Sequence, residues 1–338
     1  MKLIYQSVEE ITQGGYSIND ILYQIERSAR TCYKSIGSRY FMIKKSDDID
    51  VTVLQRLSKA NAVINDAVID GEDTLMISLP NISMSSFKEL KIYETDKTKY
   101  HLSATSNKFV DNLIKNEHTA MLEHGAIYLT YDKDIKHDKR YDFFIHNPYS
   151  RVREDDKNVY ISTNYRVIIE NDLEDELRYL SPLSDMHEKI FSFRIITNRA
   201  IANEFVRHRK MSFCQESTRF CNYSKDKFGK EITFIIPQWI KDEQQVNVHI
   251  DYDNMLYNNQ LEKDFKEGLL TSEKKYFDCI ENNLEAQDAR DILALALKTE
   301  LIMTGYRDEW YPFFKLRDDP KAHKMAQELA HEIKRYIK

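Results

Sequence analysis

Glycine is scarce in this chain, with only 8 among 338 residues. The glycines form neither a Gly-x-Gly-x-x-Gly turn nor a Walker A loop, the two motifs in which glycine backbones hold dinucleotides and triphosphates. If the protein recognises a phosphate group, side chains must therefore supply most of the contacts. This directs attention to the arginines.

Cysteine is also sparse, and no two of the 4 cysteines have the Cys-x-x-Cys spacing of zinc knuckles and dithiol redox motifs. No segment approaches the roughly 20 apolar residues that a membrane span needs. The first residues contain no apolar run of the kind found in signal peptides. We therefore expect a cytoplasmic protein with reduced thiols and no membrane partner.

Positive charge is in slight deficit, because 49 Lys and Arg stand against 55 Asp and Glu, a formal net charge of −6. This balance argues against general binding to nucleic acids, which attract basic surfaces. The hydrophobic fraction of 42% is ample for a packed core. A basic cluster in such a chain is a local feature.

One such cluster occupies residues 207–219, with the sequence RHRKMSFCQESTR. Its three guanidinium groups are planar forks that fit phosphate oxygens in a bidentate manner. With Ser217 between Arg209 and Arg219, the segment predicts a site for a nucleotide phosphate. The first residues of the segment, 207–209, also have a simpler interpretation, because basic residues at a helix C-terminus interact favourably with the helix dipole without binding any ligand.

Hydrophobic periodicity predicts helices and strands without a regular β-α-β alternation. Helices are expected at residues 17–32, 106–116, 198–206, 258–282 and 285–304, and strands at 125–131, 191–196 and 231–236. A closing helix is expected to begin with Asp319 as N-cap and Pro320 in its first turn. Residues 159–161 and 165–169 are interpreted as short strands or helical turns. The mixture predicts an α+β fold in which a mixed, largely antiparallel sheet packs with helices.

Two histidines, His118 and His124, flank Glu123 in a second notable segment. Their spacing fits no helical zinc motif such as His-Glu-x-x-His, so no metal is expected there. The alternative is a pair of structural histidines. Farther along, Arg290 and Arg317 each stand in a predicted helix, where a lone arginine is usually a surface ion-pair partner.

Taken together, these segments resemble the flavin-dependent thymidylate synthase family. The motif Arg-His-Arg, seven residues and Ser is that family's defining pattern, and it is complete here from Arg207 to Ser217. The segment with His118 resembles the family's His-x-(Ser/Thr)-Pro-(Leu/Phe)-Glu-His element, but Ala120 replaces the hydroxyl residue. Two further segments, 289–293 with Arg290 and 313–317 with Arg317, also resemble elements of the family. Tyr306 and Pro312 stand where flavin-contacting asparagines can stand.

The resemblance implies site residues for two ligands. The implied dUMP-binding residues are Glu204, Arg207, Gln215, Glu216, Ser217, Thr218, Arg219, Arg290 and Arg317. The implied FAD-binding residues are His118, Ala120, Arg207, His208, Arg209 and Gln215. Arg317 is the implied catalytic residue, since in the family its counterpart contacts the uracil ring near N3.

The resemblance further implies the reductive methylation of dUMP to dTMP, with methylenetetrahydrofolate as carbon donor and with FAD and NADPH as cofactors. It implies a homotetramer with shared active sites. The whole chain, 1–338, is expected to be a single elaborated domain with insertions near 36–105 and 135–185. Two alternatives stay open: a non-catalytic nucleotide- or RNA-binding protein, and an inactive homologue that kept the fold.

Overall fold

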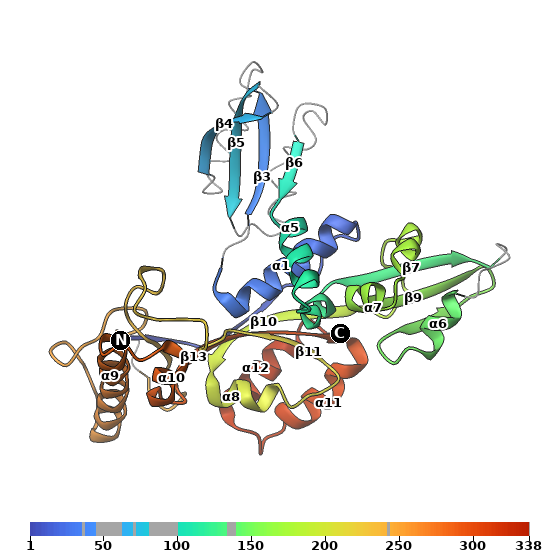
Figure 1. Cartoon of the computed structure of the whole chain (residues 1–338). Coiled ribbons are helices and arrows are strands. Elements are labelled where there is room, and N and C mark those ends of the chain that lie inside the picture. Colours follow the sequence, from blue (N-terminus) through green and yellow to red (C-terminus); the bar gives the residue numbers. More distant parts are fainter. Residues whose placement is uncertain are drawn as a thin grey trace. The chain divides into compact units, whose positions relative to one another are not determined.

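A computed structural model describes residues 1–35, 38–44, 63–69, 72–80, 101–133, 140–241 and 244–337 (Figure 1). Contacts between residues divide the chain into two compact units. Unit 1 comprises Met1–Thr12, Thr31–Lys34 and Lys189–Lys338, and unit 2 comprises Gln13–Arg30 and Ser35–Glu188. Among the residues described, no helix has the length and apolar character needed to span a bilayer.

An antiparallel sheet of four strands, in the order β11-β13-β10-β2, forms the centre of unit 1. The strands are β2 (Ser7–Glu10), β10 (Ile190–Asn198), β11 (Ser212–Gln215) and β13 (Lys298–Tyr306). β13 lies between β10 and β11, and it pairs with β10 along its full length. Residues 212–215, inside the basic cluster, are therefore fixed to a central strand.

Three helices cover one face of this sheet: α8 (Arg199–Phe205), α11 (Arg307–Arg317) and α12 (Lys324–Lys334) (Figure 1). Phe193 and Ile195 alternate along β10 and pack against them with no exposed surface. The side chain of Asn198 caps α8 by accepting a hydrogen bond of 2.8 Å from the backbone of Ile201. Such a cap satisfies an otherwise unpaired N–H group and fixes where the helix begins.

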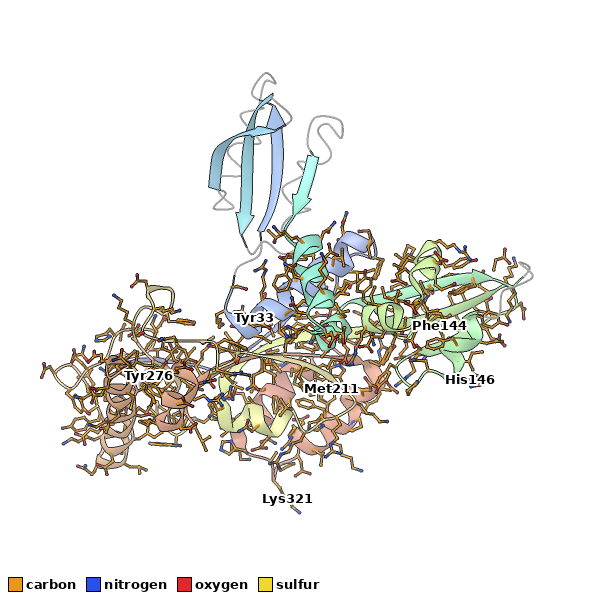
Figure 2. All side chains as sticks on the ribbon, viewed as in Figure 1. Tyr33, Phe144, His146, Met211, Tyr276 and Lys321 are labelled. Atoms are coloured by element: carbon orange, nitrogen blue, oxygen red, sulfur yellow. The ribbon has the colours of Figure 1, made fainter. Side chains whose placement is uncertain are left out.

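A second apolar cluster of unit 1 lies around the parallel pair β1 (Lys2–Ile4) and β12 (Thr233–Ile235). The helices nearby are α9 (Gln260–Glu281), α10 (Ala286–Ala289), η4 (Arg290–Ile292) and the short η3 (Asp226–Phe228). Tyr276 of α9 is fully buried in this cluster (Figure 2). Burial of one large aromatic side chain contributes about 2–3 kcal/mol to stability.

The described residues of unit 2 form two antiparallel sheets. One has the order β7-β9-β8, with β7 (Ala126–Asp132), β8 (Arg151–Glu154) and β9 (Asn158–Asn164). The other has the order β4-β5-β3-β6, with β3 (Ser38–Lys44), β4 (Val63–Ile69), β5 (Glu72–Pro80) and β6 (His101–Ala104). The second sheet lies in the predicted insertion near 36–105, whose residues 45–62 and 81–100 fall outside the described ranges.

Helices pack against the first of these sheets in the core of unit 2. They are α1 (Ile18–Tyr33), α5 (Ser106–Lys115), α6 (Arg140–His146), α7 (Tyr165–Glu170), η1 (Thr119–His124) and η2 (Glu174–Tyr179). Phe144 of α6 is fully buried there (Figure 2). The last residues of α1, Thr31–Tyr33, belong to unit 1.

The α+β prediction is confirmed, and so are most of the predicted elements. α1 begins where the Ser17 side chain was expected to cap it, since Ser17 Oγ accepts from the backbone N–H of Asp20 at 3.3 Å. The two open segments are resolved: residues 159–161 belong to a strand, and residues 165–169 belong to a helix.

The predicted helix over 285–304 is wrong. Residues 286–292 form α10 and the turn η4, but Lys298–Tyr306 is the central strand β13. Eight of its nine residues are buried because the strand is covered on both faces. A strand buried on both faces has no polar alternation, so its periodicity cannot be told from that of a buried helix.

The predicted start of the closing helix is also wrong. α12 begins at Lys324, and His323 is its N-cap, with Nδ1 accepting from the backbone of Met325 at 3.2 Å. The Asp319 side chain instead accepts from the backbone of Lys321 at 2.8 Å. This is a local turn, which Asp-Pro sequences form as readily as a helix start.

Candidate functional site

Arg317, the last residue of α11, lies in a polar cluster with Glu204 and His208. One guanidinium nitrogen forms an ion pair with the Glu204 carboxylate. Another donates to the Glu204 backbone carbonyl at 2.7 Å, and Nε donates to Nε2 of His208 at 3.2 Å. A guanidinium has five N–H donors. Arg317 is therefore firmly oriented yet keeps donors for a ligand.

His208 is a neutral hydrogen-bond acceptor in this cluster. Burial, and then the nearby charge of Arg317, lower the pKa of the imidazole to about 4. The ring also meets the edge of Phe313, with a centroid distance of 5.0 Å. An uncharged imidazole can accept from Arg317, whereas a protonated one would repel it.

A His208→Gln variant should lose less stability than the wild type between about pH 7 and pH 5. Unfolded His208 titrates near 6.5 and folded His208 near 4. In that window only the unfolded state binds the proton, so the wild type loses stability as pH falls. Glutamine keeps an acceptor for Arg317 without titrating. Urea unfolding of both proteins at the two pH values measures the difference, and equal losses would contradict it.

The segment after β11 forms a tight loop at Ser217–Arg219. The backbone N–H of Ser217 donates to the carbonyl of Cys32 at 3.1 Å. The Ser217 carbonyl accepts from the backbones of Phe220 and Cys221 at 3.2 and 3.0 Å, which closes the turn. The half-buried Ser217 is therefore held through both its backbone N–H and its carbonyl.

Arg290 approaches this loop from η4. Its guanidinium donates to Thr218 Oγ1 at 3.3 Å, across 72 residues of sequence. The structure thus brings together two of the predicted motifs, the one containing Ser217 and the one containing Arg290.

Four predicted arginines are exposed. They are Arg207, Arg209, Arg219 and Arg290. Within the part of the chain that the structure describes, none of them forms an ion pair with a carboxylate. Arg219 lies over the ring of Phe220, with 5.4 Å between the guanidinium carbon and the ring centroid. Unpaired guanidinium groups at one motif are what an anionic ligand requires.

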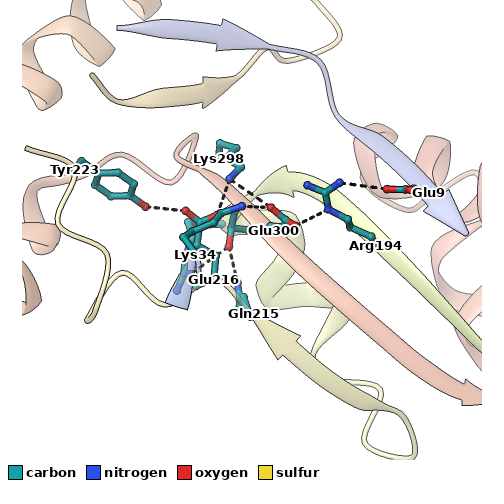
Figure 3. Close-up of polar contacts among 10 residues, drawn as sticks. Glu9, Lys34, Arg194, Gln215, Glu216, Tyr223, Lys298 and Glu300 are labelled. Atoms are coloured by element: carbon teal, nitrogen blue, oxygen red, sulfur yellow. Dashed lines mark hydrogen bonds and ion pairs between the residues drawn. The ribbon is translucent and has the colours of Figure 1, made fainter. Parts of the chain in front are cut away.

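Gln215 and Glu216 form hydrogen bonds with side chains of β13 (Figure 3). Gln215 Nε2 donates to Thr299 Oγ1 at 3.3 Å. The Glu216 carboxylate, in a residue only 2% exposed, accepts from Lys298 Nζ at 2.6 Å and from the Tyr223 hydroxyl at 3.4 Å. Glu216 is therefore held by protein groups, and its predicted contact with dUMP stays a prediction.

Sequence reasoning missed the ionic residues that are linked to Glu216 directly or through their shared partners, namely Lys34, Arg194, Lys298 and Glu300. Burial alone would raise the pKa of Glu300, but Arg194 and Lys34 hold it at about 2. A signal was present in the sequence Lys298-Thr299-Glu300. In a strand the side chains of residues i and i+2 share one face, so these two opposite charges would have been placed together. Because residues 285–304 were predicted to be a helix, in which residues i and i+2 do not face each other, the pairing of Lys298 with Glu300 was not predicted.

His118 and Ala120 belong to unit 2, and the other predicted site residues belong to unit 1. Both are exposed, and His118 is the N-cap of η1. Within unit 2, Arg166 of α7 donates to Glu123 at 2.6 Å and to Glu170 at 2.9 Å. The turn that carries Ala120 is therefore tied to α7, a helix of the predicted insertion near 135–185.

Gly125 directly follows this turn and lies against α1. A Cβ atom at this position would come within 2.7 Å of Ile25 Cδ1 and 2.9 Å of Ile21 Cγ2. Real Cβ atoms do not approach other atoms so closely, so only glycine lets the chain pass α1 into β7.

Comparison with known proteins identifies similar sequences. The family described as thymidylate synthase complementing protein matches residues 150–338, more than half of the chain. The flavin-dependent thymidylate synthase of Pyrococcus furiosus is 29% identical over 176 residues, which cover 50% of this chain and 64% of that protein. The protein of the same name from Pyrococcus horikoshii is 30% identical over 175 residues, with coverages of 50% and 64%. The chain thus spans less than two thirds of the length of these relatives.

A solved structure with some likeness is that of the UMP/dUMP methylase PolB from Streptomyces cacaoi bound with 5-Br dUMP. The match covers 44% of this chain and 64% of that one, with 16% identity and a TM-score of 0.33.

Proposed function

Because this chain belongs to the thymidylate synthase complementing protein family, we propose that it is a flavin-dependent thymidylate synthase, which methylates dUMP at C5 to give dTMP. The names of its relatives support this activity. When bound, reduced FAD supplies the hydride, methylenetetrahydrofolate supplies the carbon, and NADPH restores the reduced flavin. The enzyme is proposed to act in the cytoplasm as a homotetramer with shared active sites.

The observation that carries the proposal is the contact between Arg290 and Thr218. It joins two motif segments whose exposed guanidinium groups, those of Arg219 and Arg290, lack carboxylate partners among the described residues. A dUMP phosphate carries close to two negative charges and accepts hydrogen bonds from guanidinium and hydroxyl groups. In this proposal Ser217 is a ligand of the substrate, and no nucleophilic side chain of the protein is needed.

Arg317 is proposed to act on the uracil ring. A fixed cation beside O2 and N3 favours the N3-deprotonated, enolate-like form, and that form places electron density at C5, where the carbon is attached. The contacts of Arg317 with Glu204 and His208 support this role, because they fix the guanidinium and leave it free donors. Preorganised donors cost no rearrangement when the charge develops.

The chain's residues also fit the anionic part of FAD. Arg207 and Arg209 are exposed and, in the described ranges, unpaired, which suits a pyrophosphate. Ala120 has no polar side chain, so it can offer a flavin only its backbone. The proposed contribution of His118 and Ala120, which lie in unit 2, is to orient the flavin.

Purified protein tests the proposal directly. We expect a yellow protein that binds FAD, oxidises NADPH in the presence of dUMP, and forms dTMP once methylenetetrahydrofolate is added. A colourless protein that takes up no FAD and makes no dTMP would overturn the proposal. Intact dUMP binding without flavin uptake would instead favour an inactive homologue, and salt-sensitive RNA binding would favour a nucleic-acid-binding protein.

A further inference from the structure

A network of charged side chains around two buried carboxylates joins segments of unit 1 that are far apart in the sequence (Figure 3). Lys34 Nζ, at the end of α1, forms ion pairs with Glu300 and, at 3.6 Å, with Glu216. Lys298 Nζ lies 2.6 Å from the Glu216 carboxylate and 3.9 Å from that of Glu300. Arg194 of β10 completes the network, with Nε at 2.5 Å from Glu300.

The network is electrically balanced. Arg194 also reaches Glu9 at 3.2 Å, so that three cationic side chains (Lys34, Arg194 and Lys298) face three carboxylates (Glu9, Glu216 and Glu300). Glu216 and Glu300 are only 2% and 5% exposed. Buried carboxylates are stable only when cations and hydrogen bonds replace their water. The positive charges of Lys34 and Lys298 are therefore neutralised by these carboxylates, and the network has no excess positive charge that would attract a phosphate.

The network adjoins the start of the Ser217–Arg219 loop. Glu216 precedes Ser217, and its backbone N–H donates to the Glu300 carbonyl at 2.8 Å. On the other side, the Ser217 N–H donates to the carbonyl of Cys32, two residues before Lys34. These two backbone hydrogen bonds thus join the start of the loop to β13, which carries Lys298 and Glu300, and to the segment that carries Lys34.

We propose that this network is a positioning device for the Ser217–Arg219 loop, so that Lys298 and Lys34 control the affinity for dUMP without touching it. The inference rests on the proposed function, since it takes this loop as the phosphate-binding element. Loss of Lys298 removes the ion pair between the Glu216 side chain and β13, and loss of Lys34 removes the pair between Glu216 and the end of α1. In either case Ser217 and Arg219 are expected to spend less time in the geometry that binds a phosphate. Preorganisation of this kind affects binding more than the chemistry that follows.

A Lys298→Met variant, assembled with FAD, tests the inference. We expect its Kd for dUMP to rise by about tenfold or more, while kcat at saturating dUMP stays within about twofold. In the absence of dUMP, backbone amides of residues 216–221 should exchange hydrogen faster than in the wild type, as measured by mass spectrometry. Lys298→Arg keeps the cation and should restore much of the affinity.

Lys274→Met is the matched control, because Lys274 is an exposed lysine of α9 that pairs with Asp278 at 3.0 Å. It should change neither dUMP affinity nor exchange at residues 216–221. If Lys298→Met fails to fold, Lys34→Met takes its place, since the Lys34 side chain is more exposed, at 24% against 16%.

The outcomes separate the two proposals. Wild-type protein that binds no dUMP contradicts the proposed function, and the exchange measurement then still tests whether the network holds the loop. Wild-type protein that binds dUMP, together with a Lys298→Met variant of unchanged affinity, overturns the positioning device alone. Unchanged exchange at residues 216–221 in the variant also overturns it.

Discussion

An Arg317→Ala variant is expected to form no detectable dTMP while it still binds FAD. The guanidinium is the cation proposed to stabilise the developing negative charge on the uracil ring, and loss of one such group typically lowers kcat by about 10²–10³-fold. Arg317 is held by Glu204 and His208 at the end of α11, whereas the guanidinium groups proposed to bind FAD are those of Arg207 and Arg209. Single-turnover dTMP formation and the FAD absorbance of the same sample measure the two properties separately.

Arg317→Lys refines this experiment, because lysine keeps the charge but loses the planar fork that can contact a ring edge and Glu204 together. Its rate should lie between those of the wild type and Arg317→Ala. Arg335→Ala, which removes an exposed arginine paired with Glu332, is the control and should be fully active. Loss of FAD together with activity in Arg317→Ala would show that Arg317 holds the flavin.

The Glu300→Ala variant should lose about 3–5 kcal/mol of unfolding free energy, the usual cost of removing one partner from a buried ion pair. Glu300 is 5% exposed and receives hydrogen bonds from Arg194 and Lys34, which the substitution leaves without their shared carboxylate. This is a large share of the roughly 5–15 kcal/mol that stabilises a typical domain. Urea unfolding at neutral pH measures the loss.

Glu9→Ala is the matched control, since the Glu9 carboxylate pairs with the same Arg194 but is 60% exposed. An exposed pair contributes only about 0–1 kcal/mol, so this variant should be nearly as stable as the wild type. Equal losses in the two variants would contradict the burial argument.

The Glu300 carboxylate should also make the free energy of unfolding depend on pH in the acid range. The pKa of Glu300 is about 2 in the folded protein, against 4.5 for an ordinary glutamate. Its stabilising effect is therefore complete above about pH 4.5 and is lost as pH falls toward 2, because there the unfolded state binds the proton first. A Glu300→Gln variant lacks this contribution, and its stability should fall less steeply across that interval.

The sequence predicted the parts of the fold that local chemistry determines. Asn198 and Ser17 cap their helices through neighbours three residues away, and such spacings can be recognised in the sequence. β13 could not be recognised in this way. It is a strand because β10 and β11 pair with it on either side, and the sequence of residues 298–306 contains no sign of these partners.

In the candidate site, too, the residues within one sequence motif could be predicted, and those brought together by the fold could not. Ser217 and Arg219 lie in one contiguous motif and were found as a unit. Lys34 meets Lys298 and Glu300 only through the fold, since it lies at the end of α1 and they lie on β13, so no single segment reveals all three. That the segments of Arg290 and Thr218 lie together could be predicted only from the family resemblance, which assigned both residues to one ligand.

Ionic strength should act differently on the exposed arginines of this site and on its buried ion pairs. At physiological salt the Debye length is about 8 Å, and mobile ions screen charges that face water far more than buried ones. Arg219 and Arg290 are exposed, whereas Glu216 and Glu300 are buried and paired with their own counter-charges. Added salt should therefore weaken the attraction for an anionic ligand and leave the shape of the loop that receives it unchanged.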